Sequence, residues 1–142
     1  MRTQLTADEC SLVQASFAQV DPMADRVAAM FYGRLFELNP ALAPLFKIDM
    51  AVQSARFMEK LAIAVKGLDD LDGIAPFVQV LGRRHVDYGV KTNDYDTVCD
   101  ALLWALEAHL GSAFGPDARA AWRAAYEVLA TMMIEAGKAQ AS

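Results

Sequence analysis

The sequence predicts an all-α domain of six major helices with one or two short ones. Apolar residues recur at spacings of three and four along nearly the whole chain, and residues that suit helix caps precede these stretches. No stretch alternates between apolar and polar residues as a half-buried strand does. The 142 residues fit a single domain, 1–142, and are enough to enclose a hydrophobic core.

The first two helices are predicted from cap residues. Thr6 and Glu9 stand three apart at the head of an apolar stripe, which is the pattern of a capping box. The stretch "VDPM" ends the first helix and begins the second. Asp21 is the expected N-cap of that second helix, with Pro22 in its first position.

A short helix and a long helix are expected next. Asn39 and Pro40 begin the short one, and Pro44 limits its regularity. The long helix runs from about residue 50 to residue 66, with Gly67 as its stop.

The second half of the chain predicts three further helices. One ends at His85 and is terminated by Gly89, and Thr92 is the expected cap of the next. The turn "LGSAFGPDA" precedes the last helix, which Pro116 opens. The tail "KAQAS" is expected to fray.

Composition narrows the classes of function. The net charge of -5 and the scattered basic residues argue against a nucleic-acid partner, and no apolar run is long enough to cross a membrane. The N-terminus lacks the apolar core of a signal peptide, so we expect a cytoplasmic protein. Cys10 and Cys99 read as reduced, packed thiols. The 55% of hydrophobic residues is more than a domain of this size needs, which suits an enclosed apolar cofactor.

His85 lies on an apolar helix face, because Leu81 and Val78 precede it by four and seven residues. A histidine in such a place is more often a packed core residue than a ligand. One imidazole cannot hold a bare metal ion tightly, although it can hold an iron that a macrocycle already chelates. If His85 is a ligand, it therefore indicates haem rather than zinc.

Gln53 and Tyr32 are two further polar groups on apolar faces. Gln53 heads the stripe that continues through Phe57 and Leu61, and Tyr32 follows Phe31 in "MFYGRLF". The structural alternatives are that Gln53 faces solvent and that the Tyr32 hydroxyl bonds to backbone. The functional interpretation is that both groups point into an apolar pocket, where each can donate a hydrogen bond to a small ligand.

Four segments in order carry a resemblance to a known family. These are "FYGRLFELNPALAPLF", "QSARFM", "LGRRHVDYGV" and "AWRAAYEVLA". The chain resembles bacterial single-domain globins and the globin domain of flavohaemoglobins from its first helix to about Met133. The resemblance implies a globin fold around a haem b pocket.

The resemblance assigns roles residue by residue. It implies that His85 is the proximal iron ligand and that Phe46 packs against the haem. It places Gln53 and Tyr32 on the distal side as the groups that contact the bound ligand. Phe57, one turn after Gln53, would line the same pocket.

One part of the pattern departs from flavohaemoglobins, which pair the proximal histidine with a tyrosine and a glutamate. Tyr95 matches the tyrosine, but the glutamate position falls near Ala139 and Glu135 lies about one turn earlier. We therefore expect a backbone carbonyl to orient His85.

Several residues are expected around the cofactor with less specific signals. Leu81, on the face of His85, is expected to line the haem pocket. Arg56, Lys47 and Arg84 are candidates to pair with haem propionates, although such charges are more often solvated, and Arg56 is the best placed because it follows Gln53 by three residues. His109, near a helix C-terminus, reads as structural.

The resemblance implies a protein that binds oxygen and nitric oxide, and that converts nitric oxide to nitrate with electrons from an outside reductase. An outside donor is expected because no flavin or nicotinamide domain follows the globin-like part. The alternatives are oxygen storage without catalysis, a sensor module for gases or sulfide, and a fold of this kind that holds no haem.

Overall fold

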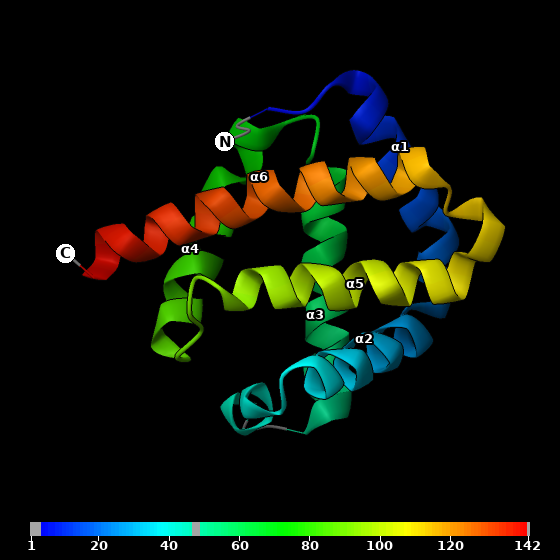
Figure 1. Cartoon of the computed structure of the whole chain (residues 1–142). Coiled ribbons are helices and arrows are strands. Elements are labelled where there is room, and N and C mark those ends of the chain that lie inside the picture. The colour runs from blue at the N-terminus through cyan, green and yellow to red at the C-terminus, as the bar shows by residue number, and fades with distance from the viewer. Residues whose placement is uncertain (1–3, 47–48, 142) are drawn as a thin grey trace.

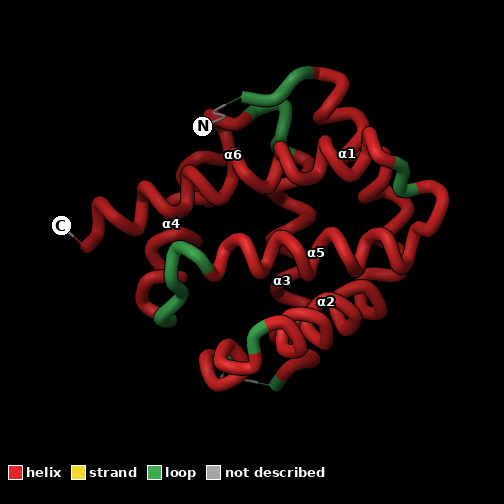
Figure 2. Tube along the Cα trace, in the orientation of Figure 1, coloured by secondary structure: helices red, strands yellow, loops and turns green. Residues whose placement is uncertain are grey.

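The computed structural model describes residues 4–46 and 49–141, with side chains described as far as 138. The described chain consists of helices joined by short loops and contains no strand, so the all-α prediction is confirmed (Figures 1 and 2). The α-helices are α1 (Ala7–Val20), α2 (Ala24–Leu38), α3 (Met50–Lys66), α4 (Leu71–Asp87), α5 (Asp94–Leu110) and α6 (Pro116–Ala141). Short 3-10 helices are η1 (Asp21–Met23), η2 (Pro40–Leu45) and η3 (Gly111–Ala113).

Two of the predicted caps are confirmed. The backbone N–H of Glu9 donates to the Thr6 hydroxyl at 3.1 Å, and the Thr6 N–H donates to the Glu9 carboxylate at 2.9 Å. This reciprocal pair satisfies two N–H groups that the first turn of α1 leaves free. At the start of η2, the Asn39 side chain accepts from the N–H of Ala41 at 3.2 Å.

Two boundaries differ from the prediction. Asp21 and Pro22 belong to η1, so α2 begins only at Ala24 and has no side-chain cap. Helix α4 continues two residues past His85, to Asp87, before Gly89 takes a φ of 88°. Glycine adopts this conformation without strain, which explains why the chain turns there.

The predicted cap at Thr92 is wrong. The N-cap of α5 is Asn93, without a side-chain bond, and the carboxylate of Asp94 accepts from the Lys91 N–H at 2.8 Å. A carboxylate accepts more strongly than a hydroxyl, so Asp94 supplies the bond that fixes this turn. Helix α6 also runs on to Ala141, where the sequence suggested fraying.

The core forms where the helices pack in pairs. Figure 1 shows α6 running across the molecule, where it packs against α1 and α4, while α2 packs mainly against α5. Within this core, the Trp122 indole donates to the Ser16 hydroxyl at 2.7 Å and so joins α6 to α1. The largest fully buried side chains are Phe31, Leu35, Leu103, Leu106, Val13, Val20, Val27, Val78 and Val128.

Helices α4 and α6 approach most closely at two glycines. A β-carbon at Gly82 would collide with the backbone of Met133, and one at Gly137 would press on the Val86 side chain. Backbones come this close only where a side chain is missing. The contact fixes α4, and with it His85 three residues after Gly82, against the C-terminal half of α6.

Among the described helices, none combines the length and the apolar character that crossing a bilayer requires.

Replacing Gly82 by alanine is expected to destabilise the fold by about 1–3 kcal/mol, because the new methyl group has only backbone to displace. Gly33→Ala is the matched control. Gly33 is exposed in α2 with open space around it, so alanine there should raise stability by about 0.5–1 kcal/mol. Thermal unfolding of both variants tests this, and equal melting temperatures would contradict the close contact.

Candidate functional site

The proximal candidate, His85, is held by its own helix. Its Nδ1 donates to the carbonyl oxygen of Leu81, one turn earlier, at 2.6 Å. A carbonyl only accepts, so the proton lies on Nδ1 and Nε2 keeps its lone pair. Burial lowers the pKa of His85, helped by the nearby charge of Lys60 and opposed by the Leu81 bond. The ring is therefore neutral at neutral pH and presents one free nitrogen.

Tyr95 packs against the same imidazole. Its ring centroid lies 6.1 Å from that of His85, with the planes 30° apart. The backbone carbonyl of Tyr95 accepts from the Tyr126 hydroxyl at 2.6 Å, which ties α5 to α6 at this point. Glu135 is exposed on α6, and the side chain of Ala139 lies outside the described residues. The Leu81 carbonyl thus orients the His85 ring, as the sequence predicted for a backbone carbonyl.

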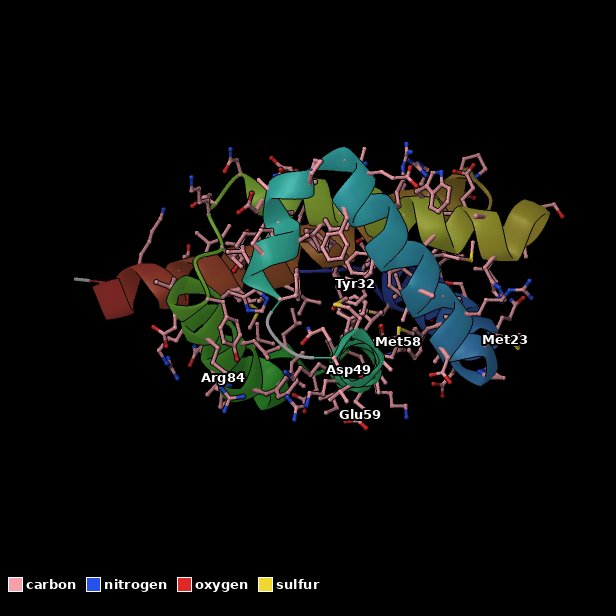
Figure 3. The ribbon with its side chains drawn as sticks, turned by 90° about the horizontal axis from the view of Figure 1, so that it is seen from below. Met23, Tyr32, Asp49, Met58, Glu59 and Arg84 are labelled. Carbon is pink, nitrogen blue, oxygen red and sulfur yellow. The ribbon has the colours of Figure 1, made fainter. Side chains whose placement is uncertain are left out.

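Tyr32 of α2 and Gln53 of α3 meet directly. The Gln53 amide nitrogen donates to the Tyr32 hydroxyl oxygen at 3.1 Å, and Tyr32 is only 5% exposed. Figure 3 shows the Tyr32 side chain pointing into the interior of the molecule. The hydroxyl accepts this bond, and in the described part of the chain its own hydrogen has no acceptor. Burial raises the pKa of Tyr32, so the phenol stays protonated and remains a donor.

Aromatic rings enclose this pair. The ring of Phe57 lies 5.8 Å from that of Tyr32, and the ring of Phe46 lies 5.4 Å from it, both edge-on. Phe31 stacks on Phe57 at 4.6 Å, and Phe36 lies 6.0 Å from Tyr32. A phenol among such rings has few competing polar groups, so a ligand that enters would be its natural acceptor.

Three cations lie along the edges of α3 and α4. Lys60 is partly buried, and its pKa is lowered by that burial and by the charges of Arg84 and Arg56. None of the three forms an ion pair within the described residues. Sequence analysis missed Lys60, although it follows Gln53 by seven residues on one face of α3. Lys47, proposed with Arg56 and Arg84, lies outside the described residues.

The structure thus forms two groups of predicted residues. His85, Leu81 and Tyr95 lie together, and so do Tyr32, Gln53, Phe46 and Phe57. In the described chain no hydrogen bond or ring contact joins the two groups. Arg56 is exposed and belongs to neither group; it lies near Lys60 and contributes to lowering the pKa of that residue.

The donor set suits a chelated metal rather than a bare ion. Among the described residues no three His, Cys, Asp or Glu side chains gather as a metal site. His85 offers one neutral nitrogen, which is the ligand that an iron porphyrin requires from a protein. The unpaired Tyr32 donor and its aromatic surroundings suit the opposite face of such a group, and the cations suit its carboxylates. The residues present therefore fit haem.

Comparisons with known proteins agree with this fit. The sequence model of the globin family, described as "Globin", matches residues 29–133. Neuroglobin of Danio rerio is 33% identical over 73% of this chain and 74% of its own length. The neuroglobins of Tetraodon nigroviridis and Chaenocephalus aceratus are 29% and 28% identical, each over 92% of this chain and 91% of their own length.

The family match covers most of the chain, and the helical fold and the donor set agree with it. The chain belongs to the globin family, and it is a globin that takes haem as its cofactor and binds oxygen and other diatomic gases.

Proposed function

We propose that this globin holds haem through His85 and binds oxygen and nitric oxide beneath Tyr32 and Gln53. We further propose that it converts nitric oxide to nitrate with electrons from an outside reductase. The observation that carries this proposal is the buried Tyr32 hydroxyl, which accepts from Gln53 and keeps its own hydrogen available. Haem, when bound, would supply an iron that can bind diatomic molecules.

His85 is suited to the proximal role because of its protonation. The bond from Nδ1 to Leu81 fixes both the tautomer and the rotation of the ring, so Nε2 is directed away from the backbone of α4. The second contact, from the Tyr95 ring, limits the tilt of the imidazole. A ligand orientation held from two sides supports a stable attachment to iron.

Tyr32 and Gln53 are suited to hold a ligand that carries negative charge. The Tyr32 O–H is a buried donor among aromatic rings, and the Gln53 amide adds a second donor when a ligand separates the pair. A hydrogen bond to a charged acceptor contributes about 1.5–3 kcal/mol. Slow ligand release follows, which favours a reaction of the held oxygen over its delivery elsewhere.

The overall reaction needs an electron. Oxygen and nitric oxide combine to nitrate when one electron is supplied, so the protein requires a donor after each turnover. Tyr32 supports this activity because the resemblance to flavohaemoglobins places it on their distal tyrosine, with Gln53 at the distal position beside it. Two free, buried cysteines are in keeping with a reducing compartment, and we propose the cytoplasm.

Loss of the His85 imidazole is expected to remove haem. Purified His85→Ala should lose the intense Soret absorption, because alanine has no nitrogen that could bind the iron. His109→Ala is the matched control, since His109 lies in the last turn of α5, and it should keep the band. Circular dichroism shows whether the variant is folded. A folded His85→Ala protein with full haem content would refute the assignment.

Removal of the Tyr32 hydroxyl is expected to speed oxygen dissociation about tenfold to hundredfold, which corresponds to one charge-assisted hydrogen bond. Flash photolysis or stopped-flow mixing measures the rate. Tyr88→Phe is the control, because Tyr88 is 58% exposed and its hydroxyl forms no hydrogen bond among the described residues. The substitution keeps the ring, which lies 6.3 Å from that of His85. An unchanged rate in Tyr32→Phe would take the hydroxyl out of the ligand site.

Nitric oxide turnover separates a catalyst from an oxygen reservoir. With oxygen and a generic flavin reductase, we expect nitric oxide to disappear and nitrate to form in equal amounts. Tyr32→Phe should reduce the rate in parallel with its faster oxygen loss. Consumption no faster than that of free haem would favour oxygen storage.

A further inference from the structure

A pocket on the side of α5 and α6 shares only Tyr95 with the residues assigned to haem. Its volume is about 640 Å³, which lies within the range of pockets that bind small molecules. His85, Tyr32 and Gln53 do not line it. The lining residues that matter here are two tyrosines, two carboxylates, a thiol and an aliphatic side chain: Tyr95, Tyr126, Asp96, Glu127, Cys99 and Ile134.

Two carboxylates line this pocket and form no ion pair in the part of the chain that the structure describes. Neither Asp96 nor Glu127 forms an ion pair or a hydrogen bond within the described residues. The cation that lines the pocket, Arg123, is already paired with Asp100 at 3.4 Å. The lining therefore carries an excess of negative charge.

The pKa of the buried Cys99 thiol beside them is affected by this negative charge. Burial raises the pKa of Cys99 to about 11, Arg123 acts against the rise, and the carboxylates of Asp100, Glu127 and Asp96 add to it. Cys99 is only 3% exposed and lines the pocket, so it forms part of the inner wall beside these acids.

Helix geometry explains only one of the two acids. Asp96 lies in the first turn of α5, where a carboxylate offsets the partial positive charge of the helix. Asp94 in that same turn already accepts a backbone N–H. Glu127 lies in the middle of α6, where no helix end calls for a negative charge. Arg123 precedes it by one turn, but this cation is paired with Asp100, and no ion pair to Glu127 forms among the described residues.

Aromatic rings complete the lining. Tyr95 and Tyr126 both reach the pocket, and a tyrosine ring attracts an organic cation through its face. Aromatic rings bind quaternary ammonium heads in this way, and a carboxylate nearby adds an attraction between opposite charges. We propose that this pocket binds a small organic cation with an ammonium or quaternary ammonium head, held by Asp96, Glu127 and the two tyrosines.

The position of the pocket gives such a ligand a route to the haem site. Tyr95 lines the pocket and also stacks on His85. A bound cation would thus contact the residue that limits the tilt of the imidazole. The binding itself rests on the pocket alone and does not depend on the role of His85.

The test uses the full-length protein and two probes of the same shape. Choline is titrated by calorimetry and by NMR, and its neutral carbon isostere, dimethylbutanol, is titrated alongside. We expect saturable choline binding with a Kd of about 1 mM or below, and at least about tenfold weaker binding of the neutral isostere. No saturation by about 10 mM choline, or equal affinity for both probes, would overturn the proposal.

Variants locate the site. Glu127→Gln should weaken choline binding about fivefold or more, and Asp96→Asn with Glu127→Gln should abolish it at these concentrations. Glu107→Gln is the matched control, because Glu107 is an exposed acid of α5 that pairs with Arg119 outside the pocket, and its affinity should stay unchanged. If the double variant disturbs the start of α5, Glu127→Gln alone decides, since it leaves that helix end intact. Unchanged affinity in Glu127→Gln would place the cation elsewhere and refute the proposal.

Discussion

The backbones of α4 and α6 meet at Gly82 and Gly137, at a separation that side chains would prevent. This contact sets where α4 lies, because α4 packs more extensively against α6 than against any other helix. Because a helix is rigid, a close backbone contact on one face also fixes the orientation of its other faces. The face that bears His85 is therefore positioned by the contact at Gly82, three residues earlier in α4.

The site divides between helices that are fixed independently. The residues proposed for the proximal side lie on α4 and α5, whereas Tyr32 and Gln53 lie on α2 and α3. No hydrogen bond or ring contact joins the two groups in the described chain. Each group is instead tied internally, by the Leu81 carbonyl on one side and by the tyrosine–glutamine bond on the other. Groups that are ordered before a cofactor arrives lose little freedom when it binds.

Sequence reasoning succeeded where an interaction is local. The capping pair of Thr6 and Glu9 spans three residues, so the pattern alone predicted it. It failed at Thr92, where two side chains compete for one turn and only geometry shows that Asp94 takes the bond. Among the site residues, Tyr32 and Gln53 were found as polar groups on apolar stripes. Lys60 was missed because its importance comes from Arg84 and His85, which lie on another helix.

The two cysteines are the side chains of this chain whose oxidation depends on how far each thiol is ionised. Oxygen, and the nitric oxide proposed as a second ligand, give rise to species that attack thiolates far faster than thiols. Cys10 and Cys99 are both buried, and burial raises the pKa of each, to about 11 for Cys99. At neutral pH nearly all of both groups is protonated and shielded. The two thiols should therefore resist oxidation near these species. The packing that forms the core also provides this protection.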